Sequence, residues 1–234
     1  MKRGVANGSV ADMWEQRDGG SASVRTLWRA RVEQPETYAV AGSEYWGVSF
    51  VRTADGLLSA EMNGPTLRSA TVDGVLGDEY WGVELAPHVM IVAAGKDTFQ
   101  GATVALPVAD GRVRIGERWH RIPDFEGLER WVSDLVDAGT LRIDGGIRAA
   151  LSGDRTGATD RTWQRRFRRV VGLTSAQVRQ LARAQHAYVL LQSGLSPAEA
   201  AANAGFSDQA HLTRSLRMIR GQTPAAIVAA HLSQ

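Results

Sequence analysis

Arginine is the residue type with the most chemistry to offer in the second half of this sequence. Residues 151–234 contain eleven arginines, no lysine and four acidic residues. Several of these arginines fall in two segments of matching sequence, 165–174 and 214–223, which align at an offset of 49. Four positions are identical in the two segments: Arg165 and Arg214, Arg168 and Arg217, Gly172 and Gly221, and Thr174 and Thr223. Because a guanidinium group binds phosphate or the edge of guanine through paired hydrogen bonds, the repeat predicts a duplicated anion- or base-contacting surface.

Each segment also carries apolar residues at the spacing of one helical face. These stripes are Trp163, Phe167 and Val170 near the first segment and Leu212, Leu216 and Ile219 near the second. The glycine that follows each stripe suits the left-handed backbone with which many helices end. The sequence therefore predicts two short basic helices, each with one buried face and a terminal glycine.

The residues before the second basic helix indicate how that helix is used. Residues 196–199 read Ser-Pro-Ala-Glu, a capping box with proline at the first helical position. Small residues follow up to Gly205, which allows a tight turn before a helix expected from Asp208 to Arg220. This pattern predicts a helix-turn-helix, whose second helix lies in the major groove of DNA. Its exposed face would present Gln209, Thr213, Arg214 and Arg217; the alternative is an ordinary helical hairpin with solvated arginines.

A long helix is predicted between the two basic helices. Thr174-Ser175-Ala176-Gln177 is a second capping box, and an apolar face continues to about residue 192, before Gly194. A helix over 175–192 spans about 27 Å at 1.5 Å per residue. It would hold two reading helices close to one turn of DNA apart, about 34 Å, so that one chain reads two successive major-groove segments.

These motifs resemble the AraC-type DNA-binding domain. The resemblance covers roughly residues 130–234 and depends most on Gly205-Phe206-Ser207-Asp208-Gln209 and on Gly221-Gln222-Thr223-Pro224. It implies two helix-turn-helix units, at about 141–172 and 196–221, and sequence-specific regulation of transcription on double-stranded DNA. It also implies that Arg161, Gln164 and Arg165 of the first unit and Gln209, Thr213 and Arg214 of the second contact DNA. The sequence repeat adds Arg168 and Arg217, its second pair of identical arginines, to these contacts.

The first unit departs from the pattern in its turn. Gly205 precedes Arg214 by nine residues, whereas Gly153 precedes Arg165 by twelve. The turn over 154–158 is therefore expected to be about three residues longer than usual. Two consecutive glycines at 145–146 also weaken the supporting helix, at roughly 1 kcal/mol for each interior glycine. We therefore expect this unit to dock on DNA differently or more weakly than the second.

Residues 23–122 have a different texture, typical of strands. Short alternating runs lie between glycine, proline, asparagine and aspartate turns. The pentapeptide Glu-Tyr-Trp-Gly-Val occurs at 44–48 and again at 79–83, which indicates equivalent strands in a sheet or barrel. In one interpretation Trp46 and Trp81 are core residues beside glycines that let the backbone bend. In the other, these two tryptophans line a cavity for a small molecule.

Composition and charge narrow the class of protein. The 234 residues are 44% hydrophobic and 22% charged, and none is cysteine. Residues 1–150 carry 16 basic and 21 acidic residues, a net charge of −5, whereas residues 151–234 carry 11 and 4, a net charge of +7. No apolar run is long enough to cross a membrane, and the five histidines are not spaced as metal ligands. We therefore expect a cytoplasmic DNA-binding protein that is not an enzyme and has no metal, cofactor or membrane contact.

The expected architecture is an α+β chain of two domains. A flexible segment (1–22) precedes a β-rich, barrel- or sandwich-like domain (23–122), and an all-α double helix-turn-helix domain follows (123–234). The β-rich domain is expected to sense a small-molecule effector or to form a homodimer, and to act on the DNA-binding domain through a helix at 124–138. RNA polymerase is a further candidate partner. The alternatives are an enzyme, or a dimerisation domain without a ligand, fused to a DNA-targeting module.

Overall fold

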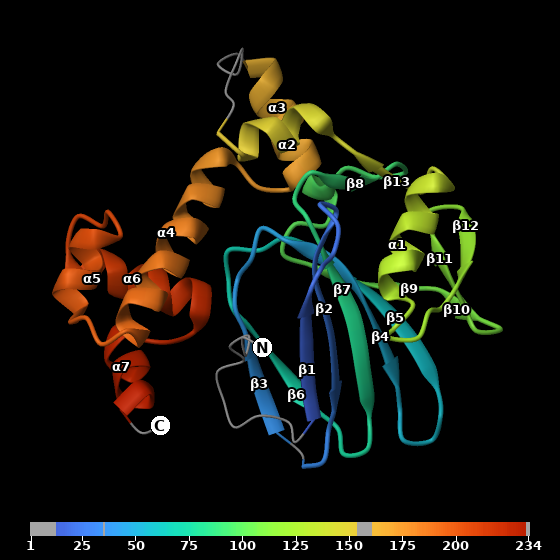
Figure 1. Ribbon diagram of the computed structural model, residues 1–234, viewed down its shortest axis with the longest axis horizontal. Coiled ribbons are helices and arrows are strands. Elements are labelled where there is room, and N and C mark those ends of the chain that lie inside the picture. Colours follow the sequence, from blue (N-terminus) through green and yellow to red (C-terminus); the bar gives the residue numbers. More distant parts are fainter. Residues whose placement is uncertain (1–12, 35, 154–160, 233–234) are drawn as a thin grey trace.

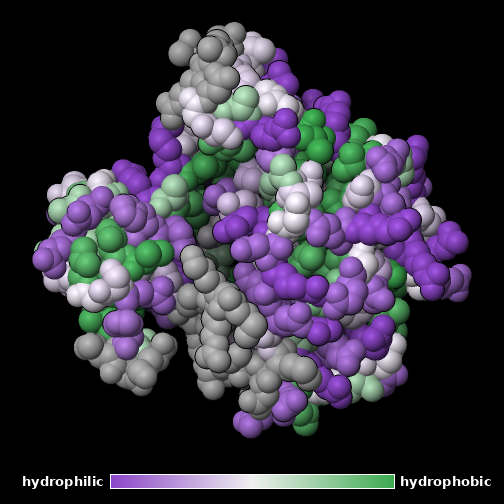
Figure 2. Space-filling model, in the orientation of Figure 1, coloured by the Kyte–Doolittle hydropathy of each residue, from purple (hydrophilic) through white to green (hydrophobic). Residues whose placement is uncertain are grey.

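The computed structural model describes residues 13–34, 36–153 and 161–232. Strands dominate up to residue 121, and helices dominate from residue 145 onward (Figure 1). This confirms the predicted order of a β-rich region followed by a helical region. In the view of Figure 2, hydrophilic residues cover most of the outer surface of the sheet region, with smaller hydrophobic areas among them.

The largest element is a six-stranded antiparallel sheet. Its order is β1 (Met13–Asp18), β2 (Val24–Arg31), β7 (Glu79–Leu85), β4 (Trp46–Arg52), β5 (Leu58–Asn63) and β9 (Thr103–Leu106). Strand β1 corrects the prediction of a flexible segment over 1–22, because residues 13–18 pair along their whole length with β2. The Trp14 ring stacks on Trp28 of β2 at 5.5 Å, a cross-strand contact that stabilises this edge. Residues 1–12 lie outside the described residues.

The two copies of the Glu-Tyr-Trp-Gly-Val repeat are neighbouring strands. They pair antiparallel with Val48 opposite Val83, so the copies are related by a local twofold between β4 and β7. A Cβ added to Gly47 would lie 2.2 Å from the Val83 carbonyl oxygen, which explains why this position is glycine. The sequence interpretation of equivalent strands therefore holds.

The two tryptophans of the repeat belong to the hydrophobic core. Trp46 and Trp81 are only 2% and 7% exposed, and their indole N–H groups donate to the carbonyls of Val89 and Pro123. The interpretation that they line a ligand cavity is therefore not supported, because neighbouring rings and aliphatic side chains fill the space around them. Phe50, for example, stacks on Trp81 at 5.5 Å.

Smaller β elements surround the main sheet. Strands β3 (Glu36–Val40) and β6 (Ala70–Gly74) form one ribbon, and β8 (Val89–Ile91) pairs with β13 (Leu141–Ile143) in another. Strands β10 (Val108–Ala109), β11 (Arg112–Ile115) and β12 (Arg118–Arg121) form a three-stranded sheet. A short 3-10 helix, η1 (Lys96–Thr98), follows β8.

Helix α1 (Leu128–Asp137) falls within the helix predicted at 124–138, but it packs on the main sheet and not in the helical domain to which the sequence assigned it. Leu128, Trp131, Val132 and Leu135 pack in the core of the main sheet, where Trp131 meets Phe50 edge-on at 5.5 Å. The stripe is thus occupied in covering the sheet. The main-sheet core continues to Leu141, and the helical core begins at Ile147. The domain boundary predicted near residue 122 therefore lies before the change from one core to the other, and so does the predicted start of the first helix-turn-helix unit near 141. Residues 141–143 are still a strand of the β-rich region.

The second core belongs to the helices that follow. These are α2 (Gly145–Leu151), α3 (Arg161–Val171), α4 (Ser175–Gln192), α5 (Pro197–Asn203), α6 (Gln209–Arg220) and α7 (Pro224–Leu232). Buried residues of α2–α6 and Ile227 of α7 form one cluster, which Met90 of β8 joins from the β-rich region. Helix α4 occupies the residues predicted for the long helix, and α3 and α6 lie near its opposite ends (Figure 1). The longer turn predicted over 154–158 lies outside the described residues.

Both predicted capping boxes are present. The Thr174 hydroxyl accepts a hydrogen bond from the Gln177 backbone N–H, and the Gln177 side chain accepts one from the Thr174 N–H. We expect Thr174→Ala to lower the free energy of unfolding by about 1 kcal/mol, because α4 loses one of its terminal acceptors. Urea unfolding followed by circular dichroism measures the change. Thr174→Ser keeps the hydroxyl and should be close to wild type; an equal loss in both variants would contradict a capping role.

Candidate nucleic-acid interface

Helix α3 exposes the four side chains predicted to contact DNA from the first unit. Phe167, Val170 and Val171 are buried and fix the orientation of the helix. Arg161, Gln164, Arg165 and Arg168 are exposed. At 100° per residue these four positions fall on the side of the helix away from the buried stripe, so they form one outward face.

Helix α6 presents the corresponding face of the second unit. Leu212, Leu216 and Ile219 are buried beneath it. Gln209, Arg214 and Arg217 are exposed, whereas Thr213 is half-buried and its hydroxyl donates to the Gln209 carbonyl at 2.8 Å. Thr213 therefore offers its methyl group and a hydroxyl oxygen that can still accept, because its one hydroxyl hydrogen is already donated.

The N-terminus of α6 is fixed by an aspartate. The Asp208 carboxylate accepts from the His211 backbone N–H at 2.7 Å and from the Ser207 hydroxyl at 3.0 Å. These hydrogen bonds, that from His211 first, lower the pKa of Asp208 below its ordinary value. The cap is thus ionised at neutral pH and holds the first turn, where Gln209 lies, in helical geometry.

Three arginines of these helices have other surroundings. Arg166 forms an ion pair with Asp144, the N-cap of α2, at 2.8 Å. Arg220 is buried on the Tyr188 ring, 3.5 Å from its centroid, and donates to Gln185 at 2.9 Å. Burial lowers the pKa of Arg220 from its ordinary value. Arg169 is exposed but lies on the flank of α3 beside a groove described below.

The sequence repeat marks most of the outward-facing arginines. At the offset of 49, four of them occur in both copies, as Arg165/Arg214 and Arg168/Arg217, whereas the outward-facing Arg161 aligns with Ala210. Arg166, Arg169 and Arg220 align instead with Ser215, Met218 and Val171. The duplicated arginines lie on the outward faces. Of the unduplicated ones, Arg166 and Arg220 have partners within the protein, whereas Arg161 faces outward and Arg169 lies on the flank of α3.

Loops of the β-rich region contact the C-terminal ends of both helices. The backbone N–H of Gly42 donates to the Ile219 carbonyl of α6 at 2.6 Å, and that of Ser69 donates to the Met218 carbonyl at 2.9 Å. At the end of α3, Gly172 (φ +84°) packs so closely on Pro65 that an added Cβ would lie 2.5 Å from the proline Cγ. Residues 64–69 therefore reach the ends of both helices and form one physical link between the two regions, beside the contacts of η1 and β8 with α3. Coupling through the helix at 124–138 stays a prediction.

The junction also contains two buried basic side chains. Lys96 of η1 is fully buried, donates to the Pro87 carbonyl at 2.6 Å and lies 5.3 Å from the Trp46 ring centroid. His88 is 7% exposed, and its Nε2 has no hydrogen-bond partner among the described residues. Desolvation lowers the pKa of Lys96 well below its ordinary value. Desolvation also lowers the pKa of His88. The positive charges of Arg148 and Lys96 lower this pKa further, whereas the negative charge of Asp144 raises it.

His88 should make the stability of the protein depend on pH. Because its pKa is lower in the folded than in the unfolded protein, stability is unaffected above the unfolded value of about 6.5 and falls as pH drops below it. The slope for one proton is at most about 1.4 kcal/mol per pH unit. We expect His88→Gln to lose less stability than wild type between pH 7.5 and 5.5 in urea titrations. An identical pH dependence in both proteins would assign the effect to other groups.

The helical region of the chain is similar to a known domain family. Residues 153–230 match a family model described as "Helix-turn-helix domain". Among curated protein sequences none matches the chain. Similar solved structures include ToxT from Vibrio cholerae in a P21 crystal form, with a TM-score of 0.44, 8% identity, and coverage of 92% of this chain and 98% of that one. ToxT bound to (E)-4-(8-methylnaphthalen-1-yl)but-3-enoic acid gives a TM-score of 0.38, 7% identity, and coverage of 93% and 99%.

A helix-turn-helix domain that presents arginines outward supports a role for this chain in binding DNA to regulate transcription. Residues 153–230 are an AraC-type helix-turn-helix domain. The resemblance stated from the Gly-Phe-Ser-Asp-Gln and Gly-x-Thr-Pro elements is thereby confirmed. Within the described residues, no helix is both long and apolar enough to span a membrane.

Proposed function

We propose that this protein is a sequence-specific regulator of transcription that inserts α3 and α6 into two successive major-groove segments of one DNA duplex. In this proposal Arg165 and Arg214 bind guanine or phosphate, and Gln164 and Gln209 contact base edges. Arg161, Arg168, Thr213 and Arg217 complete the two contact surfaces. The acidic β-rich region lies outside the contact and regulates it.

One observation carries the proposal: the two arginine pairs duplicated in sequence are all exposed on the outward faces of α3 and α6. Each lies on a helix whose opposite face is buried, so the outward direction of the guanidinium groups is set by the core. The eighteen residues of α4 separate the two helices, which at 1.5 Å per residue is about 27 Å. This separation suits neighbouring major-groove segments, which are about 34 Å apart along the duplex.

Footprinting with the full chain tests the two-segment arrangement. Genomic DNA fragments retained by the protein are sequenced, and hydroxyl-radical footprints are then recorded on the preferred site. We expect two protected segments about one helical turn apart on one face of the duplex. Protection of a single segment would contradict the double contact, and equal affinity for random DNA would contradict sequence specificity.

We further propose that the β-rich region modulates DNA binding, through a small molecule or through a homodimer. The loop at 64–69 supports this part of the proposal, because it contacts the end of α6 through Ser69 and the end of α3 through Pro65. A shift of this loop would change the relative orientation of the two helices. Modulation requires that the effector or the second copy favours one of the two orientations.

A further inference from the structure

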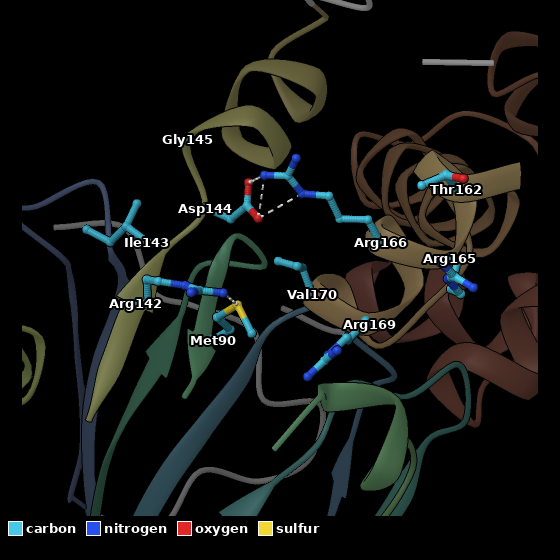
Figure 3. Close-up of a pocket in the computed structure, with 10 residues that line it drawn as sticks. All are labelled: Met90, Arg142, Ile143, Asp144, Gly145, Thr162, Arg165, Arg166, Arg169 and Val170. Carbon is cyan, nitrogen blue, oxygen red and sulfur yellow. Dashed lines mark hydrogen bonds and ion pairs between the residues drawn. The ribbon is translucent and has the colours of Figure 1, made fainter. Parts of the chain in front are cut away.

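A groove lies between the β8–β13 ribbon and the flank of α3 (Figure 3). Its volume is about 590 Å³, within the range of small-molecule sites. Met90, Ile143 and Val170 supply its apolar surface, and the arginines that line it are Arg142 of β13 and Arg165, Arg166 and Arg169 of α3. Neither the sequence motifs nor the DNA-reading faces account for this collection of side chains.

The charges in the groove do not balance. Among the described residues that line the groove, Asp144 is the one carboxylate, and it forms an ion pair with Arg166 at 2.8 Å. The hydrogen bond of the Arg142 side chain within the described ranges goes to the Met90 sulfur at 3.4 Å, and a thioether is a weak acceptor. Within the described part of the chain, neither Arg165 nor Arg169 forms an ion pair. In the part of the chain that the structure describes, the guanidinium groups of Arg142, Arg165 and Arg169 thus border one cavity without a carboxylate at ion-pair distance.

The groove uses a different side of α3 from the DNA-reading face. Residues 162, 166 and 169 lie three or four positions apart and therefore share one flank of the helix. Residues 161, 164 and 168 lie on the outward face, and Arg165 falls at the border between the two. Arg142 and Arg169 have no counterpart in the second helix-turn-helix unit, so the groove is a feature of the first unit alone.

We propose that this groove binds a small organic anion, a carboxylate or a phosphate attached to a short apolar group. The anionic group would bind between Arg142 and Arg169, and the apolar group would lie on Met90, Ile143 and Val170. In Figure 3 the Arg142 side chain extends along the groove toward Met90 rather than away from the protein. This orientation favours a ligand inside the groove over a phosphate of the DNA backbone outside it.

A ligand in this position would contact both regions of the protein at once. Arg142 belongs to the β-rich region, whereas Arg166 and Arg169 belong to a DNA-reading helix. Since Arg165 borders both the groove and the reading face, occupancy should change the affinity of α3 for DNA. This consequence rests on the proposed function, whereas anion binding itself does not.

Calorimetric titration of the full chain tests the site directly. The probes are benzoate and phenyl phosphate, with benzamide as the neutral analogue, all at constant ionic strength. We expect one or both anions to bind with a stoichiometry of one and benzamide not to bind; the stronger of the two identifies the anionic group. Arg142→Gln and Arg169→Gln should each weaken binding by about ten-fold or more, because each removes a charged hydrogen-bond donor. Arg130→Gln, an exposed arginine of α1 outside the groove, should leave binding unchanged.

Each other outcome has a definite meaning. The site is overturned when neither anion binds, when benzamide binds as well as benzoate, or when the two groove variants match Arg130→Gln. A loss of DNA affinity in Arg142→Gln without any anion binding would assign the groove to the DNA backbone, which also overturns the proposal. Anion binding that leaves DNA affinity unchanged would overturn the coupling and leave both the site and the proposed function standing.

Discussion

Replacement of Arg214 by alanine is expected to lower affinity for the target DNA by about 1–3 kcal/mol, and replacement of Arg165 by a similar amount. Both side chains are exposed on helices anchored from behind by buried apolar residues, so the substitutions remove a contact without disturbing the core. Titrations of target and random DNA at several salt concentrations measure the effect. Loss of a contact to guanine would reduce the preference for target over random DNA. Loss of a contact to phosphate would instead weaken binding to both DNAs and reduce the salt slope by about one.

The matched control is Arg130→Ala, which removes the same charge from an exposed position on α1. Its effect should be limited to the general reduction in positive charge and should be the same for both DNAs. If Arg165→Ala and Arg214→Ala behave like this control in affinity and in salt slope, α3 and α6 are not the helices that contact DNA. An effect in Arg214→Ala alone would place the second unit on DNA and leave the first unit off it.

The helical region followed from local rules in the sequence. Capping boxes at Thr174 and Ser196 and the glycines at 172, 205 and 221 mark helix ends through contacts within a few residues. Such signals do not depend on the rest of the fold, and the predicted 175–192 helix accordingly matches α4. The outward arginines followed from the same periodicity, because the buried stripe of each helix fixes which side faces solvent.

What failed to follow from the sequence depends on contacts between distant residues. The apolar stripe of α1 predicts a helix, but it fits a sheet as well as a helical bundle, and only the fold shows that Trp131 meets Phe50. Trp46 and Trp81 are of a residue type that often lines binding cavities, but the fold buries both of them in the hydrophobic core. Asp144 has no neighbour in sequence that would indicate its ion pair with Arg166, 22 residues away.

The junction between the regions is also invisible locally. Gly42 and Ser69 donate to carbonyls of α6 that lie 177 and 149 positions further along the chain. These carbonyls are among the last of the helix and have no partner within it, so any loop with free N–H groups can bind them. The loop at 64–69 does so while it also contacts Gly172, and the two helix ends are thereby held in one arrangement.

Gly172→Ala is expected to destabilise the protein more than any single change at the DNA-reading faces. The φ of +84° would cost an alanine about 1–3 kcal/mol in backbone strain. Its Cβ would also lie 2.5 Å from the Pro65 Cγ and 3.2 Å from the Lys96 Cβ, and such overpacking costs typically 1–3 kcal/mol more. Urea unfolding gives the total, and DNA titration shows whether displacement of the 64–69 loop also changes affinity.

Gly194→Ala separates the two contributions. Gly194 has a φ of +92° at the end of α4 but no atom within 4 Å of an added Cβ, so it carries the strain without the contact. The excess loss in Gly172→Ala over Gly194→Ala then measures the packing between the two regions. Pro65→Ala removes the clashing Cγ and should recover much of that excess in the Gly172→Ala background, while it should restore nothing in the Gly194→Ala background. If both glycine variants lose the same free energy of unfolding and Pro65→Ala recovers none of it, the 64–69 loop moves aside for the added methyl group. The packing of this loop on α3 would then contribute nothing to stability.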